Sequence, residues 1–148
     1  MPSALSEVDR LTRVAVKHPR DAFVDMQTIA RQWQELHFSA PPDLDRASRE
    51  HDLLVEALSA SGAQIHLLPR DDRTTLDSIY VRDASIVCER GLILCAMGKP
   101  QRIGEPAAQE RACVAGHMPG GVPGRIGSPG PCPALPDGMT FYIYELRE

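Results

Sequence analysis

The chain has 148 residues, of which 43% are hydrophobic and 24% charged, and it carries a formal net charge of −4. These values are ordinary for one globular domain with a real core. Lys and Arg form no cluster, so nucleic acid is not expected as a partner, because phosphate binding needs grouped cations. No apolar stretch approaches the ~20 residues of a membrane span. Since no apolar signal-peptide core follows the N-terminus, we expect a cytoplasmic, reducing setting.

The four cysteines, Cys88, Cys95, Cys113 and Cys132, form no Cys-x-x-Cys pair. Zinc sites in proteins usually contain such pairs, so no metal site is predicted. Cys88 and Cys95 lie in apolar runs, and we interpret them as small buried hydrophobic residues.

The first part of the chain alternates strand and helix patterns. The apolar run Val14–Val16, flanked by polar residues, predicts a strand that ends at His18-Pro19. A helix is predicted over residues 25–37, where apolar residues recur at helical spacing. Its apolar positions are Met26, Ile29, Ala30, Trp33 and Leu36.

A longer helix is predicted after the Pro41-Pro42 breaker, with Asp43 as its N-cap and Gly62 at its end. Its apolar face consists of Leu44, Ala47, Leu54, Val55 and Leu58. Residues 63–69 then form a predicted strand. The succession of helix, glycine and strand favours an α/β fold.

Shorter elements follow the second strand. Strand-like pieces are predicted at 78–81 and 84–88, and a further strand over 91–97 completes a hairpin with them. Glu105-Pro106 opens another helix, since proline is tolerated in the first helical turn.

The composition changes at residue 113. Residues 113–148 contain seven glycines and six prolines, and such a stretch does not build regular structure. We therefore divide the chain into an α/β portion, residues 1–112, and a Gly/Pro-rich tail, residues 113–148, that we expect to be disordered or foreign to the fold. A frameshift or a truncated reading frame would explain a foreign tail, and a natural flexible tail is the alternative.

Three charged residues form the most informative pattern. Asp77 and Asp83 stand six positions apart, and Arg102 follows Asp83 by nineteen. An aspartate accepts two parallel hydrogen bonds from a guanidinium group, and an arginine holds a carboxylate in the same forked way. The set therefore suits a zwitterionic ligand with a cationic head. The alternative is that Asp77 caps a turn and that Arg82 or Arg102 forms a surface ion pair.

Residues 11–112 resemble the N-terminal part of the guanidino-group modifying enzymes, which include dimethylarginine dimethylaminohydrolases, arginine deiminases and amidinotransferases. The segments that carry the resemblance are Val14–Pro19, Gly62–Pro69, Leu76–Asp83 and Gly98–Pro106. The resemblance implies the pentein fold, an α/β propeller of five ββαβ modules around a central channel that holds the substrate. This chain would supply about the first two modules, hence a partial propeller.

The resemblance also implies a chemistry and a set of roles. In the family a cysteine attacks the guanidinium carbon, a histidine acts as acid and base, and a covalent thiouronium forms without a metal or organic cofactor. By position, Asp83 resembles the carboxylate that grips the guanidinium, Asp77 the residue that engages the α-amino end, and Arg102 the carboxylate clamp. Arg82 stands where dimethylarginine hydrolases carry glutamate and looks more like the deiminases, so arginine and methylated arginine both remain open as the substrate.

The family's Gly-Gly-Asp segment, catalytic histidine and C-terminal cysteine would lie beyond residue 112. Gly120-Gly121-Val122 lacks the acid, and His117 and Cys132 lie in a segment without the rigid platform that catalysis needs. No catalytic residue is therefore predicted. We expect a truncated guanidino hydrolase that keeps its substrate-binding residues and is inactive alone.

Three alternatives remain open. In the first, the chain is an interaction module that self-associates through open propeller edges. In the second, it is an amidinotransferase-related protein without hydrolase activity. In the third, it is an enzyme built by self-association around Cys88, Cys95 or Cys113. The histidines His18, His51 and His66 are interpreted as structural or surface residues. His37 falls where family members place a flap near the channel mouth, so the resemblance implies a ligand contact there.

Overall fold

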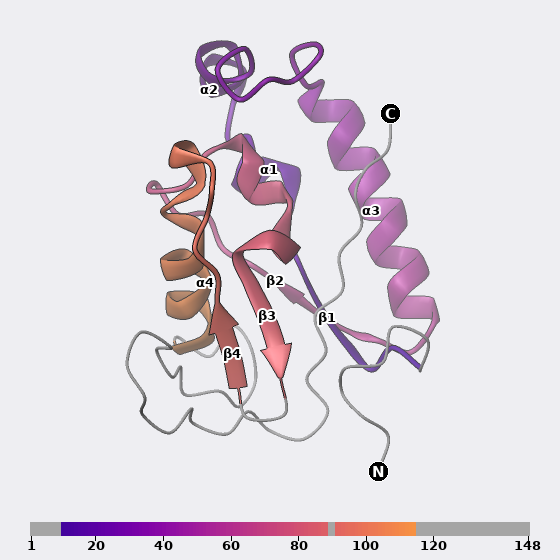
Figure 1. Ribbon diagram of the computed structural model, residues 1–148. Coiled ribbons are helices and arrows are strands. Elements are labelled where there is room, and N and C mark those ends of the chain that lie inside the picture. Colours follow the sequence, from indigo (N-terminus) through magenta and orange to yellow (C-terminus); the bar gives the residue numbers. More distant parts are fainter. Residues whose placement is uncertain (1–9, 89–90, 115–148) are drawn as a thin grey trace.

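The computed structural model describes residues 10–88 and 91–114 (Figure 1). Helices and strands alternate through both ranges, so the chain is an α/β protein, as predicted. The elements are β1 (Arg13–Val16), α1 (Pro19–Ala22), α2 (Met26–Gln32), α3 (Leu44–Ala60), β2 (Gln64–Leu67), the 3₁₀ helices η1 (Leu76–Ile79) and η2 (Val81–Ala84), β3 (Ser85–Cys88), β4 (Gly91–Leu94), the 3₁₀ helix η3 (Pro100–Arg102) and α4 (Glu105–Val114). In Figure 1, α3 and α4 lie on opposite sides of the strands.

The first sheet joins β1 and β2 in parallel, with Val14 opposite Ile65 and Val16 opposite Leu67. Parallel strands need a crossover connection, and α1, α2 and α3 provide it. The core beneath this sheet contains Val14, Val16, Leu58 and Ala63, with Leu11, Leu54, Val55 and Ile65 packed against it. Because these residues come from both strands and from α3, burying them fixes the long helix against the sheet.

Local signals define the ends of α3. The Asp43 side chain accepts a hydrogen bond from the Arg46 backbone N–H at 2.9 Å, as an N-cap should. Gly62 has a φ of +88°, the left-handed conformation that glycine adopts without a steric cost. The predicted cap and the predicted end of the helix are both confirmed.

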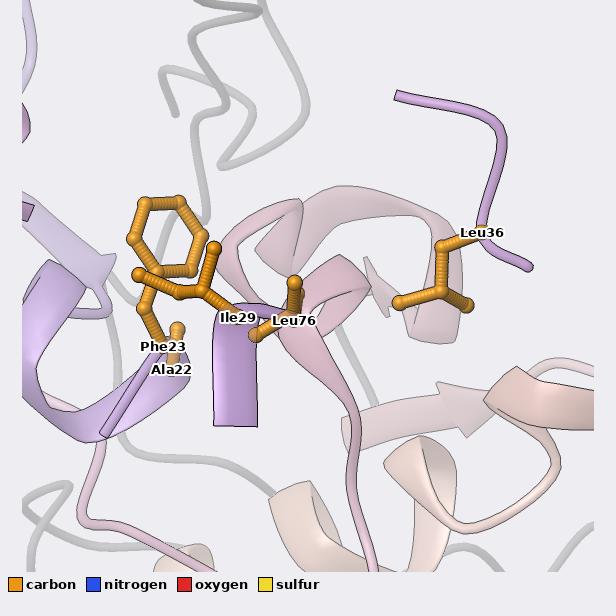
Figure 2. Packing of buried hydrophobic residues seen from close by; sticks show 5 residues of the cluster. All are labelled: Ala22, Phe23, Ile29, Leu36 and Leu76. Carbon is orange, nitrogen blue, oxygen red and sulfur yellow. The ribbon is translucent and has the colours of Figure 1, made fainter. Parts of the chain in front are cut away.

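A second core lies between the short helices. It contains Ala22, Phe23, Ile29, Leu36 and Leu76. Figure 2 shows Ala22, Phe23, Ile29 and Leu76 close together, with Leu36 to one side. Leu76 is fully buried, and its backbone N–H donates to the Gln32 side chain at 3.1 Å. This contact fixes η1 to the end of α2, so the core also fixes the position of the next residue, Asp77.

The second sheet is the antiparallel hairpin of β3 and β4, with Ser85 opposite Leu94. The hairpin is confirmed. Helix α4 contacts β4 and η2. Gln109 of α4 makes the connecting hydrogen bonds, donating to the Val81 carbonyl at 2.6 Å and accepting from the Ser85 hydroxyl.

Several predicted elements differ from the structure. The strand predicted at 78–81 is wrong, because residues 76–84 form two 3₁₀ helices that place polar side chains together. Helix α2 ends at Gln32, since the chain turns there and Phe38 N–H bonds back to the Trp33 carbonyl at 2.9 Å. Strand β4 stops at Leu94.

Helix α4 runs to Val114, past the predicted boundary at residue 112. Most of the predicted tail, residues 115–148, lies outside the described residues. Within the described ranges, no helix combines the length and apolar character that crossing a membrane requires.

Candidate functional site

The three residues singled out from the sequence lie on three consecutive 3₁₀ helices, with Asp77 on η1, Asp83 on η2 and Arg102 on η3. All three line one hollow of about 1030 Å³. The loop after α2 supplies Leu36 and His37 to the same wall. The structure therefore brings the predicted set together, although Asp77 and Arg102 are 25 positions apart in the sequence.

Arg102 is the most heavily bonded of the three. Its Nε donates to Glu105 Oε1 at 2.9 Å, and its Nη2 donates to Glu105 Oε2 at 2.8 Å and to the Tyr80 carbonyl at 3.1 Å. Its Nη1 donates to Asp83 Oδ2 at 2.6 Å. Since arginine has five N–H donors, these four bonds leave one N–H, on Nη1, for any other partner.

Electrostatics keep the Arg102 charge in place. Burial disfavours the charged guanidinium, but the hydrogen bonds to Glu105 and Asp83 outweigh it, and the pKa of Arg102 is raised. Burial disfavours the charged carboxylate of Glu105 and so raises its pKa, while the neighbouring Arg102 opposes that rise. Glu105 therefore fixes the Arg102 guanidinium with two hydrogen bonds, and Arg102 in turn fixes the Asp83 carboxylate with a third.

Asp77 has a different partner. Its Oδ2 lies 2.6 Å from the Lys99 ammonium nitrogen, and the same nitrogen donates to the Leu36 carbonyl at 2.7 Å. The Asp77 side chain is only 6% exposed, and that of Lys99 is 31% exposed. An acid this deeply buried needs a cation beside it, and Lys99 is that cation.

Asp83 is the open acid of the hollow. Its side chain is 52% exposed, although Arg102 holds one of its oxygens. An ionised carboxylate has about four acceptor positions. Asp83 therefore keeps positions for an incoming cationic group.

The structure adds two residues that the sequence reading missed, Lys99 and Glu105. The sequence pattern marks Glu105 only as the opening of a helix, whereas Arg102 lies on η3 before that helix, so the pattern does not predict their pairing. Lys99 carries no signal of its pairing either, because its partners Leu36 and Asp77 are far from it in sequence. His37 does line the hollow, and it has a φ of +67°.

His18, His51 and Asp52 form a group that resembles a metal site, with one ligand atom of each within 4.8 Å of the others. His18 Nδ1 accepts a hydrogen bond from Arg20 N–H at 3.0 Å, so its other nitrogen carries the proton in the neutral ring. That nitrogen faces Asp52 at 3.3 Å. It offers no lone pair to a metal ion, so the group as it stands fits a hydrogen-bonded pair.

Cys95 is half-buried and is not among the residues that line the hollow. His37 is the histidine that does line it. The hollow thus combines acids and cations, without a thiol among the side chains described there. The chain is thus an α/β protein with a hollow lined by acidic and basic side chains.

The comparisons with known proteins name the family. The N(G),N(G)-dimethylarginine dimethylaminohydrolase of Pseudomonas aeruginosa is 35% identical over 107 residues, which are 70% of this chain and 41% of that protein. A crystal structure of a dimethylarginine dimethylaminohydrolase adduct with 4-chloro-2-hydroxymethylpyridine superposes with a TM-score of 0.55 and 26% identity, over 81% of this chain and 42% of the other. No protein-family model matches the chain. The chain belongs to the guanidino-group modifying enzyme superfamily and spans about two fifths of the length of these relatives.

Proposed function

We propose that the hollow binds the guanidino group of arginine or methylated arginine, and that the chain is the substrate-holding part of a dimethylargininase-like hydrolase. The observation that carries the proposal is that Asp77, Asp83 and Arg102, the residues to which the resemblance assigns the ligand, all line one hollow. The similarity to dimethylarginine dimethylaminohydrolase, in sequence and in structure, supports the same substrate class. The partial propeller of about two modules is part of this proposal.

Asp83 is the group we assign to the guanidinium. Its exposed carboxylate accepts hydrogen bonds from the ligand's N–H groups, and its negative charge stabilises the cation that persists as the attacked carbon becomes tetrahedral. Arg102 and Glu105 hold Asp83 at a fixed position, so little ordering is needed when the ligand arrives.

We assign Arg102 to the ligand's carboxylate, with a restriction. Because four of its N–H groups are used within the protein, it offers one hydrogen bond and a positive charge, and it offers a fork only if the Asp83 pair opens. Asp77, which the resemblance assigns to the α-amino end, is already paired with Lys99.

The reaction proposed for the complete protein is hydrolysis of a C–N bond. A cysteine thiolate attacks the guanidinium carbon, the amine leaves with a proton, and water then cleaves the thiouronium to citrulline and restores the thiol. We propose that neither the nucleophile nor the base belongs to the hollow described above. The chain alone is then inactive and would need further chain, or another copy at its open edges, to act.

Calorimetry and a citrulline assay on the purified chain test this function with arginine and dimethylarginine. We expect binding without turnover, and a loss of affinity of roughly tenfold to a hundredfold in Asp83→Asn, the scale of one charge-assisted hydrogen bond. Asp72→Asn is the matched control, because Asp72 is an exposed acid outside the hollow. Equal affinities for the two variants would refute the assignment, and turnover abolished by Asp83→Asn would mean that this chain contains its own nucleophile.

A further inference from the structure

Lys99 occupies the part of the hollow that an amino-bearing ligand would need. Its ammonium nitrogen lies 2.6 Å from Asp77 Oδ2 and 2.7 Å from the Leu36 carbonyl oxygen. One carboxylate oxygen and one backbone carbonyl are the acceptors that a ligand's α-ammonium group would use there, since both cations are tetrahedral N–H donors. The protein's own side chain has therefore taken these acceptors.

The burial of Asp77 makes this occupation consequential. Its side chain is 6% exposed, so it offers little surface for a second cation while Lys99 stays. Two ammonium groups beside one buried carboxylate would repel each other in a medium of low dielectric constant. If Lys99 instead swings out, the ligand regains only the two contacts that Lys99 has lost.

In either case the α-ammonium group of a ligand contributes no affinity, and in the first case it weakens binding. We propose that Lys99 is the built-in cation of this subsite, and that the hollow selects guanidino acids without an α-ammonium group over arginine-type amino acids. This inference rests on the proposed function, because it takes the guanidino group at Asp83 as given. It changes the substrate class, since the family resemblance alone points to an amino acid.

Two ligands that differ in one group test the proposal. Arginine and δ-guanidinovalerate share the guanidinium, the carbon chain and the carboxylate, and only arginine has the α-amino group. Calorimetric titration of the full chain should give tighter binding for δ-guanidinovalerate. In Lys99→Gln, which keeps a donor for Leu36 and removes the charge, arginine should gain about tenfold in affinity and become the preferred ligand.

The charge-keeping variant Lys99→Arg is the control, and it should retain the preference of the unaltered chain. Tighter binding of arginine than of δ-guanidinovalerate by the unaltered chain would overturn the proposal without any variant, so it stays testable even if Lys99→Gln fails to fold. An unchanged preference in folded Lys99→Gln would overturn it as well. Failure of both ligands to bind to any form would refute the proposed function, whereas binding of both with arginine preferred would refute only the role of Lys99.

Discussion

Replacing Glu105 with glutamine should destabilise the chain strongly, because it removes the charge that balances Arg102. The side chains of Arg102 and Glu105 are 11% and 3% exposed, and two hydrogen bonds join them. Removing one partner of a buried pair costs about 3–5 kcal/mol, since the other charge stays buried. Asp83 still pairs with Arg102, so we expect the lower end, about 3 kcal/mol.

Urea unfolding followed by circular dichroism measures this loss, and the chain offers a matched control. Glu50 pairs with Arg46 four residues earlier on the surface of α3, where both side chains are largely exposed. Glu50→Gln should cost at most about 1 kcal/mol, as exposed pairs do. If Glu105→Gln loses no more stability than Glu50→Gln, the support that we describe for Asp83 does not exist.

Two further predictions concern the core and the pH dependence of stability. Leu76→Ala should lower the free energy of unfolding by about 2–5 kcal/mol in the same urea assay, because Leu76 is fully buried where α2 and η1 meet. A loss of stability no larger than that of the exposed Glu50→Gln would contradict this packing. Burial, and next the neighbouring His18, lower the pKa of His51 below its ordinary 6.5, with Asp52 opposing the shift. The unfolded chain then binds the proton more readily, so stability is full above about pH 6.5 and falls as the pH drops below it, and His51→Phe should flatten this fall.

The sequence predicted well those features whose cause is local. Helix α3 was predictable with its cap at Asp43 and its end at Gly62, because a carboxylate N-cap and a left-handed glycine act within one helical turn. Strands β1 and β2 followed from apolar runs of ordinary length. The hairpin of β3 and β4 followed from two strand-like runs that lie close together in the sequence.

The walls of the hollow were not predictable in the same way. Residues 76–84 form 3₁₀ helices too short to show any apolar period, so the β-branched Ile79 and Val81 suggested a strand. The partner of Asp77 is 22 residues away, and the forked pair of Arg102 depends on burial that no spacing reveals. The family resemblance pointed to residues that line one hollow, but it did not reveal which internal charges they already bind.

The two acids of the hollow differ in their exposure and in their internal partners, and this difference affects which of them meets a cation from solution. Asp77 is 6% exposed and paired with Lys99, whereas Asp83 is 52% exposed and rests on Arg102, whose charge Glu105 already balances. A new cation at Asp77 must displace or oppose Lys99, but at Asp83 it meets acceptors facing the hollow. These differences support our proposal that the guanidinium binds at Asp83 and that Lys99 controls which groups bind beside Asp77.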